Sequence, residues 1–268
     1  MEISERVVVV TGGASGIGRA LARRLVSAGT RGVVVADLDE AGAQAVAAEL
    51  GDRALGVGCD VSEDAEVNRL IDRTEEAFGP VDVFCANAGI GTGHGLDAPD
   101  DVWDRMLAVN LRSHVLAARR LMPGWLKRGE GYFVSTASAA GLLTQVGDAP
   151  YAVTKHAAVA FAEWLSVTYG DRGVRVSCLC PMGVNTALLQ GGLDTPGSEG
   201  LGPRLVAAAG RVLEPEEVAE AVMEAVSAER FLILPHPEVL TFFARKGADY
   251  DRWLAGMRRL QAQVGGAG

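Results

Sequence analysis

Cysteine, basic side chains and metal-binding patterns are all scarce in this chain of 268 residues. Its four cysteines are too few for a disulfide scaffold, so we expect reduced thiols buried in a core. They lack the spacing and the histidine partners of a zinc site, and we therefore expect no metal. Lysine and arginine number 25 against 34 aspartates and glutamates, a net charge of −9. This balance argues against a nucleic-acid partner, because binding a phosphate backbone requires clustered cations.

Long apolar runs are missing as well. No stretch of about 18 apolar residues occurs, so we expect no membrane insertion. Residues Met1–Arg6 lack the basic and apolar regions of a signal peptide, which favours a cytoplasmic location. No low-complexity linker divides the chain, and its length suits one large domain. We therefore interpret residues 1–268 as a single domain.

What the sequence does contain is a regular alternation of short β-branched runs and longer helical stretches. Two of the runs, Val7–Val10 and Val33–Val35, are uninterrupted valine, typical of strands covered on both faces. The alternation predicts an α/β fold of the doubly wound, Rossmann type: a seven-stranded parallel sheet with helices on both faces. Ligands of such sheets bind at the carboxyl ends of the strands. The expected strands are Arg6–Val10, Gly32–Ala36, Ala54–Gly58, Val81–Ala86, Tyr132–Ser135, Val174–Leu179 and Phe231–Leu234.

Two helix starts are readable from local chemistry. Ser62 precedes Glu63 and Asp64, which predicts an N-cap followed by acids in the first turn. Pro215 followed by Glu216 predicts a helix with proline at its first position.

Two segments near the end of the sequence are candidates to cover a ligand. Gln190–Pro203 is rich in glycine and follows the sixth expected strand, so we expect a flexible substrate lid around residues 186–210. The tail at residues 235–268 covers either the substrate pocket or a partner subunit, and the sequence leaves both open. Its apolar residues are Phe242, Phe243, Trp253, Leu254, Met257 and Leu260.

A glycine-rich loop follows the first expected strand directly. It reads Thr11-Gly12-Gly13-Ala14-Ser15-Gly16-Ile17-Gly18 and leads into the helical stretch Arg19–Ala28. Glycines permit a tight turn and let the backbone approach a diphosphate, whose charge is favoured at a helix N-terminus. This position between strand and helix predicts dinucleotide binding. The expected contacts are Gly12, Ser15, Gly16, Ile17 and Gly18.

An acid at the end of the second expected strand indicates which dinucleotide. Asp37 can accept hydrogen bonds from the adenosine ribose hydroxyls, and its charge repels a 2′-phosphate. Its expected neighbours Ser15 and Leu38 supply no cation, while Arg19 is equally interpretable as solvated helix surface. The pattern favours NAD over NADP, with Asp37 and Leu38 among the contacts.

The third and fourth expected strands also end in candidate contacts. Asp60 and Val61 are placed to border an adenine ring. Asn87-Ala88-Gly89 offers small residues that let the backbone pass beneath a flat ligand, although an ordinary strand-to-loop turn remains an alternative.

Four polar side chains form the candidate catalytic group. Tyr151 and Lys155 are four residues apart and so share one helix face. A nearby ammonium favours phenolate, as does the positive nicotinamide of an oxidised cofactor, and Tyr151 could then exchange a proton with an alcohol or carbonyl. Ser138, just beyond the fifth expected strand, can hold a substrate oxygen beside the phenol. Asn110 is a further polar residue in an apolar context, either part of the site or a satisfied buried amide.

Together these motifs resemble the short-chain dehydrogenase/reductase family in its single-domain form, from about Ser4 to Pro235. The resemblance implies an acid/base role for Tyr151 and an orienting, polarising role for Ser138. It also implies that Lys155 clamps a ribose and modifies the phenol's pKa.

The same resemblance implies further contacts. Asn110 would support a bound water in a proton relay. Asp60 and Val61 would contact adenine, and Asn87 the neighbouring ribose.

The segment after the sixth expected strand departs from the family pattern. Pro181 and Thr186 resemble the family's proline-glycine-x-x-x-threonine segment, but Met182 stands at the usual glycine and Gly183 follows it. The resemblance implies that Thr186 reaches the nicotinamide carboxamide, with further contacts from Pro181, Gly183 and Val184.

The sequence as a whole predicts an NAD-dependent oxidoreductase that interconverts a secondary alcohol and a ketone. The candidate pocket is apolar, which favours a lipid-like, terpenoid, steroid or aromatic alcohol. A further wall is expected from Gly91–Gly95, in which we interpret His94 as capping the loop. Two alternatives stay open: a regulator that senses NAD/NADH without turnover, and a family member acting on a sugar, cyclic diol or acyl thioester. The pocket residues are Leu142, Leu143, Val146, Met182, Val184, Leu188 and Leu189.

The resemblance also implies a homo-oligomer, preferably a tetramer, with a dimer as the alternative. Helices near Asn110–Leu126 and Tyr151–Tyr169 would pack across its interface.

Overall fold

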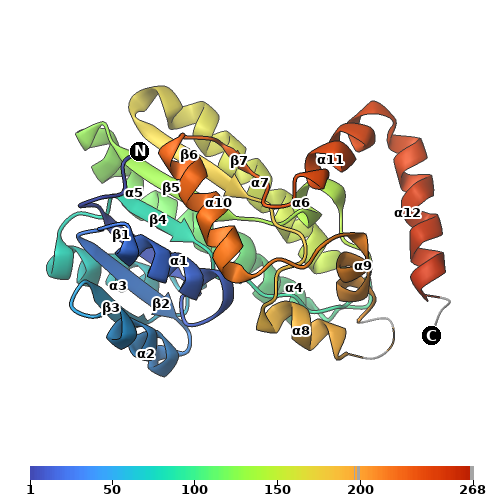
Figure 1. Ribbon diagram of the computed structural model, residues 1–268, viewed down its shortest axis with the longest axis horizontal. Helices are drawn as coiled ribbons and strands as arrows, with labels where there is room; N and C mark the ends of the chain where they lie inside the picture. The colour runs from blue at the N-terminus through green and yellow to red at the C-terminus, as the bar shows by residue number, and fades with distance from the viewer. Residues whose placement is uncertain (196, 198–199, 266–268) are drawn as a thin grey trace.

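Seven parallel strands form one twisted sheet in the computed structural model, which describes residues 1–195, 197 and 200–265 (Figure 1). The strand order is β3-β2-β1-β4-β5-β6-β7, so the chain moves outward in one direction from β1 and then in the other from β4. This arrangement confirms the doubly wound Rossmann-type fold. The strands are β1 (Val7–Thr11), β2 (Gly32–Asp37), β3 (Ala54–Gly58), β4 (Val83–Ala86), β5 (Gly131–Thr136), β6 (Val174–Leu179) and β7 (Leu232–Ile233).

Six long helices cover the two faces of the sheet. Each carries an apolar stripe toward the strands, because residues three and four apart lie on the same side of a helix. One face packs against α3 (Asp64–Phe78), α5 (Ser113–Arg128) and α7 (Ala149–Tyr169). The other packs against α1 (Gly16–Ser27), α2 (Glu40–Leu50) and α10 (Pro215–Ser227).

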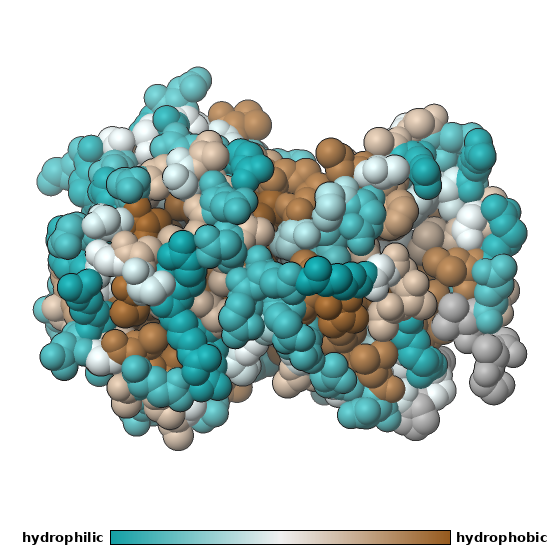
Figure 2. Space-filling model, viewed as in Figure 1, coloured by the Kyte–Doolittle hydropathy of each residue, from teal (hydrophilic) through white to brown (hydrophobic). Residues whose placement is uncertain are grey.

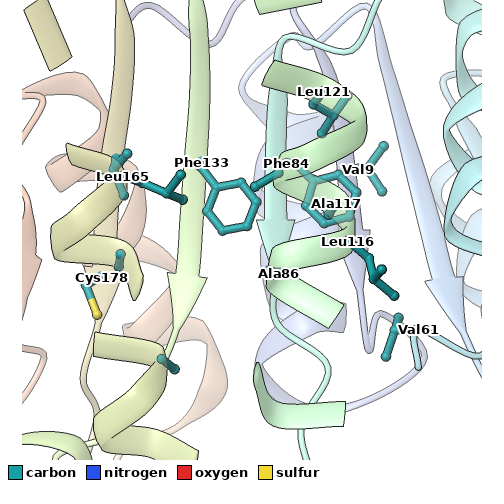
Figure 3. Close-up of a cluster of buried hydrophobic side chains, with 14 of the residues drawn as sticks. Val9, Val61, Phe84, Ala86, Leu116, Ala117, Leu121, Phe133, Leu165 and Cys178 are labelled. Carbon is teal, nitrogen blue, oxygen red and sulfur yellow. The ribbon is translucent and has the colours of Figure 1, made fainter. Parts of the chain in front are cut away.

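The sheet separates two hydrophobic cores because successive strand residues point to opposite faces. Val9 points to the α3/α5/α7 side, whereas Val8 and Val10 point to the α1/α2/α10 side. On the first side the Phe84 and Phe133 rings stack with their centroids 5.9 Å apart (Figure 3). This pair connects β4 to β5 at the centre of the sheet.

All four cysteines are buried free thiols, as the sequence predicts. Burial raises the pKa of Cys59 and of Cys85 to about 12, so both behave as small apolar residues. None of the helices in the described part of the chain is both long and apolar enough to cross a membrane.

One of the two predicted helix starts is confirmed and the other is wrong. Pro215 opens α10, and the Glu214 and Glu217 side chains complete a capping box there. Ser62 is not an N-cap: α3 begins at Asp64, and the Ser62 hydroxyl donates to the Asp60 carboxylate instead.

The remaining elements include the segment expected as a substrate lid around residues 186–210. Within the described residues this segment carries two short helices, α8 (Ala187–Leu193) and α9 (Leu201–Ala209), and its role as a lid stays a prediction. The predicted tail forms α11 (Glu238–Ala248) and α12 (Tyr250–Gly265), which extend at the far right of Figure 1. Residues 196, 198–199 and 266–268 of these two segments lie outside the described residues. The other elements are α4 (Asp100–Leu107), the π-helical η1 (Ala108–Arg112), α6 (Ala140–Leu143) and the 3₁₀ turn η2 (Gly170–Arg172).

Removing one ring of the central aromatic pair tests this description of the core. Phe133→Ala should lower the free energy of unfolding by about 3–5 kcal/mol, because it leaves a cavity against Phe84 and removes buried apolar area. Urea denaturation measures the change. The control Phe243→Ala, at a ring that is 41% exposed on α11, should cost far less. Equal losses in the two variants would contradict the assignment of the core.

Candidate active site

A cleft of about 1620 Å³ runs along the carboxyl edge of the sheet, where a doubly wound fold binds its ligands. Its lining begins at Asp37 and Leu38 after β2 and passes Tyr151 and Lys155 on α7. It continues to Leu260 on α12. Predicted site residues from the ends of six strands, β1 to β6, are thus brought to one surface.

The glycine loop forms the floor of this cleft between β1 and α1. Gly12 and Gly16 have φ angles of +64° and +49°, which favour glycine. A Cβ on Gly12 would lie 2.9 Å from the Ala88 Cα, so side chains cannot be accommodated there. No side chain caps α1 and no acid occupies its first turn. Its exposed N–H groups and dipole therefore suit a diphosphate.

The predicted loop contacts separate into two groups. Gly12, Ser15, Gly16 and Ile17 line the cleft, but Gly18 does not. A Cβ on Gly18 would lie 2.0 Å from the Gly12 carbonyl oxygen, so this glycine permits close packing of α1 on the loop.

Asp37 lies at the end of β2 with its carboxylate fixed by backbone groups. Its Oδ2 accepts a hydrogen bond from Ala14 N at 3.0 Å and its Oδ1 accepts one from Asp39 N at 3.1 Å. Arg19 does not approach this carboxylate, because its guanidinium pairs with Glu49 at 2.9 Å. The charge near the expected ribose is therefore negative.

Asp60 and Val61 line the same end of the cleft, as predicted. The Asp60 Oδ2 pairs with Arg105 Nη1 at 3.1 Å, and its Oδ1 accepts from the Ser62 hydroxyl at 2.6 Å. Burial opposes ionisation of Asp60, but the Ser62 and Arg105 contacts outweigh it and lower the pKa of the carboxyl. Arg105 has no motif that would reveal it in the sequence.

Asn87 joins the ends of three strands. Its amide nitrogen donates to Thr11 O at 3.0 Å and Gly12 O at 3.3 Å, while its oxygen accepts from the Thr136 hydroxyl at 3.3 Å. Asn87, Ala88 and Gly89 all line the cleft, but the side-chain nitrogen of Asn87 already donates its hydrogen bonds to backbone carbonyls. Its main visible role is to hold β1 and β4 together beneath the loop.

Ser138, Tyr151 and Lys155 converge at the end of β5. Lys155 is 3% exposed, and its Nζ donates to Thr136 O at 3.0 Å and lies 5.6 Å from the centroid of the Tyr151 ring. The Ser138 hydroxyl accepts from Ala140 N at 3.1 Å and interacts with the Tyr151 phenol. The three side chains predicted from spacing thus share one site.

Burial shifts both titrating groups of this site away from their charged forms. It raises the pKa of Tyr151, an effect that the Ser138 hydrogen bond only partly offsets. It lowers the pKa of Lys155 to about 8. The protein groups alone therefore do not lower the Tyr151 pKa, because desolvation dominates; the effect expected from an oxidised nicotinamide stays a prediction.

Asn110 is fully buried in the π-helical turn η1 and does not line the cleft. Its Oδ1 accepts from Ile90 N at 2.9 Å, and its Nδ2 donates to Ile90 O at 2.9 Å and to the Thr154 hydroxyl at 3.2 Å. These contacts favour the buried-amide alternative for the side chain. Its role toward a relay water stays a prediction.

Asp148 is a site residue that the sequence reasoning missed. It is 7% exposed and caps α7 by accepting from Tyr151 N at 3.0 Å. Its other oxygen accepts from Thr92 N at 2.8 Å and Gly93 N at 2.7 Å. The carboxylate therefore holds α7 and the loop at Thr92 and Gly93 together. The sequence pattern that could have identified Asp148 is an aspartate directly before Ala149-Pro150, which is a favourable start for a helix.

The segment after β6 is held by a second missed residue, His236. The ring is 2% exposed: Nδ1 accepts from Met182 N at 3.1 Å, and Nε2 contacts Gly183 O at 3.2 Å. Gly183 faces away from the cleft, whereas Pro181, Met182, Val184 and Thr186 line it. Of the predicted contacts here, Gly183 alone is displaced, because its carbonyl is turned toward His236.

The substrate end of the cleft is largely apolar. Leu142 lies in the core instead, where its carbonyl accepts from Lys246 Nζ, and His94 contributes a carbonyl that accepts from Ala149 N at 2.9 Å. Figure 2 shows apolar residues gathered over α8 and α9. The cleft-lining residues from the predicted pocket, wall and tail are Leu143, Val146, Met182, Val184, Leu188, Leu189, Gly91, Thr92, Gly93, Phe242, Trp253, Met257 and Leu260.

Comparisons with known proteins identify the family of this chain. The model of the short chain dehydrogenase family matches residues 6–195. A 1-deoxy-11-beta-hydroxypentalenate dehydrogenase of Streptomyces exfoliatus is 38% identical over 89% of this chain and 86% of that protein. A 3beta-hydroxysteroid dehydrogenase of Eggerthella lenta is 34% identical over 82% of this chain and 86% of its own length. A short chain dehydrogenase/reductase from Burkholderia phymatum, solved with NAD, has a TM-score of 0.85 and 32% identity over 94% of this chain and 96% of that one.

The chain therefore belongs to the short-chain dehydrogenase/reductase family and is an oxidoreductase acting on CH–OH groups.

The buried lysine generates a testable pH dependence. The folded-state pKa of Lys155, about 8, lies below its usual 10.5, so the unfolded chain binds more protons in that window. The contribution of Lys155 to stability should therefore rise with pH through this range, by at most about 1.4 kcal/mol per pH unit. Lys155→Met removes this pH-dependent contribution. Tyr151 is present in both proteins, so its own contribution cancels in the difference between them.

The measurement is the difference in free energy of unfolding between wild type and variant, by urea denaturation across this pH window. A difference that stays flat or falls would show that the ammonium is not desolvated.

Proposed function

We propose that this protein is an NAD-dependent dehydrogenase that interconverts a secondary alcohol and a ketone. The observation that carries the proposal is the convergence of the Ser138 hydroxyl, the Tyr151 phenol and the Lys155 ammonium beside the glycine loop. A dinucleotide sensor needs the loop but has no use for these three groups together. A dehydrogenase needs both.

Each catalytic side chain has a distinct task in this proposal. In oxidation, Tyr151 Oη takes the proton of the substrate hydroxyl, and Ser138 holds the same oxygen in line with the phenol. Lys155 offers N–H groups beyond its bond to Thr136 O, and these bind ribose hydroxyls and stabilise phenolate. Bound NAD supplies the hydride acceptor. Asp148 keeps the first turn of α7 in place so that the phenol stays aimed at the cleft.

The choice of NAD over NADP rests on the end of β2. The Asp37 carboxylate is held by two backbone N–H groups and faces no guanidinium from Arg19. It can accept from ribose hydroxyls, and it repels a 2′-phosphate. The uncapped α1 N-terminus and the left-handed turn at Gly12 and Gly16 fit the diphosphate of either cofactor.

We also propose that the substrate has an apolar skeleton. The pocket end of the cleft carries Leu143, Val146, Met182 and Leu188. The names of the Streptomyces and Eggerthella relatives, a hydroxypentalenate and a hydroxysteroid dehydrogenase, support the same substrate type. The segment at 186–210, with α8 and α9, is the proposed lid, and α11 and α12 form the outer wall.

A homo-oligomer, preferably a tetramer, is part of the proposal. Val153, Trp164 and Val167 on α7 are between 50% and 88% exposed, and apolar side chains gathered on one helix suit an interface with another copy. The cytoplasmic location stays a prediction from the sequence.

Removing the phenol hydroxyl tests the assigned chemistry. Tyr151→Phe should lower kcat for a secondary alcohol by about a hundredfold to ten-thousandfold, because proton transfer loses its acceptor. NAD binding should persist, as measured by titration. The control Tyr169→Phe, at the other end of α7, should keep wild-type turnover. Unchanged turnover in Tyr151→Phe would remove the phenol from the mechanism.

Neutralising the β2 carboxylate tests the cofactor assignment. Asp37→Asn should shift the kcat/KM ratio of NAD to NADP by roughly tenfold toward NADP, because a charge-assisted hydrogen bond and a repulsion are both lost. Initial rates with the two cofactors measure the ratio. Asp39→Asn is the matched control, since that residue caps α2 outside the cleft lining. A ratio that moves equally in both variants would contradict the role of Asp37.

A further inference from the structure

Three arginines line the outer end of the cleft, far from the cofactor loop. Arg245 lies on α11, and Arg252 and Arg259 lie on α12. Arg252 and Arg259 are seven residues apart, which places both on one face of the helix. All three are exposed at the rim and line the same cleft as Tyr151.

These arginines lack the ion pairs that several other arginines on the molecule form. Arg6, Arg19 and Arg24, for example, each pair with a glutamate within 3.0 Å. Among the described residues, no carboxylate lies within 4.0 Å of a guanidinium nitrogen of the three cleft arginines. The lining acid nearest in sequence, Asp249, uses its Oδ1 to accept from Arg252 N at 2.9 Å.

The local charge is therefore opposite to that of the whole chain. Three guanidiniums and one carboxylate give this end of the cleft a surplus of positive charge, whereas the chain carries −9. Such a surplus attracts anionic ligands and orients them as they enter. A guanidinium also matches the planar, two-oxygen geometry of a carboxylate.

The position of the arginines separates them from the adenosine end. α12 and α2 lie at opposite ends of the molecule in Figure 1, and Asp37 precedes α2 directly. A 2′-phosphate bound near Asp37 would therefore not reach them. Apolar side chains on the same two helices, including Phe242, Trp253 and Met257, line the cleft as well.

We propose that the substrate is an amphipathic alcohol that carries a carboxylate at the end remote from its hydroxyl, and that Arg252, with Arg245 and Arg259, binds this carboxylate. This inference rests on the proposed function and names its substrate class. The hydroxyl end reaches Ser138 and Tyr151, the apolar skeleton fills the middle of the cleft, and the acid meets the guanidiniums.

A matched pair of substrates tests the proposal. A hydroxydecanoate with its alcohol at the penultimate carbon, and the methyl ester of that acid, differ only in the charge of the far end. The wild-type protein should prefer the acid in kcat/KM by roughly tenfold, the value of a charge-assisted hydrogen bond at a partly exposed site. High salt should reduce the preference, because it screens exposed charges.

Arginine variants test whether the preference for the acid over the ester depends on the cleft arginines. Arg252→Gln and the double variant Arg245→Gln/Arg252→Gln should bring the acid-to-ester ratio close to one, while Arg252→Lys should retain part of it. Arg258→Gln is the matched control: this exposed arginine precedes Arg259 on α12 but does not line the cleft. It should keep the wild-type ratio. Equal rates for acid and ester in the wild type, or equal losses in Arg252→Gln and Arg258→Gln, would overturn the proposal.

A binding measurement separates this proposal from the proposed function. Calorimetric titration of the NADH-loaded protein with decanoate and with methyl decanoate needs no turnover. Tighter binding of decanoate that is lost in Arg252→Gln would support the carboxylate subsite even if no alcohol were oxidised. Turnover of alcohols without any preference for decanoate would overturn the subsite and leave the dehydrogenase standing. Arginine variants that change the sedimentation mass and leave the binding preference intact would assign these residues to a subunit interface instead, which overturns the proposal.

Discussion

Burial of the Lys155 ammonium against the carbonyl of Thr136 is the interaction on which the site depends. A charged amine in a protein interior requires partners, because its loss of hydration is not otherwise compensated. The end of β5 provides Thr136 O at 3.0 Å, and the α7 backbone places Tyr151 one turn before the lysine. The Asp148 carboxylate then holds the start of the same helix to the loop at Thr92 and Gly93.

The electrostatics of the site follow from the same burial. Desolvation lowers the pKa of Lys155 to about 8 and raises that of Tyr151. The two groups have similar pKa values in water, and burial separates these values. Titrating pairs separated in this way are typical of acid/base sites. The protein alone thus stabilises a neutral phenol, and the phenolate needs additional positive charge in the cleft. That requirement couples proton transfer at Tyr151 to occupancy of the cleft.

The sheet and the glycine loop could be predicted because their signals are local. The valine runs in β1 and β2 are unbroken, and the loop stands directly between β1 and α1. Ser138, Tyr151 and Lys155 could be predicted from their spacing, the position of Ser138 after the fifth expected strand and the family resemblance. The helices α8 and α9 could not be predicted, because the glycine-rich composition of their segment hides the helical signal and α9 packs against the distant α12.

The partners of buried polar groups could not be predicted from the sequence. Asn87 binds the carbonyls at the end of β1, and His236 holds a segment more than fifty positions away in the chain. Such contacts depend on tertiary packing and leave no periodic pattern. The direction of the Tyr151 pKa shift also depends on tertiary packing. A spacing of four residues reveals that Lys155 is a neighbour, but it does not reveal how deeply the phenol is buried.

The central claim is that this cleft transfers a hydride from a carbinol carbon to NAD. The most direct measurement is mass spectrometry of the reduced nicotinamide formed when the protein acts on a secondary alcohol deuterated at that carbon. The account predicts that one deuterium per turnover appears in the reduced cofactor. Bound NAD that stays oxidised across a broad set of secondary alcohols, acids included, would contradict the account and favour a sensor of the dinucleotide.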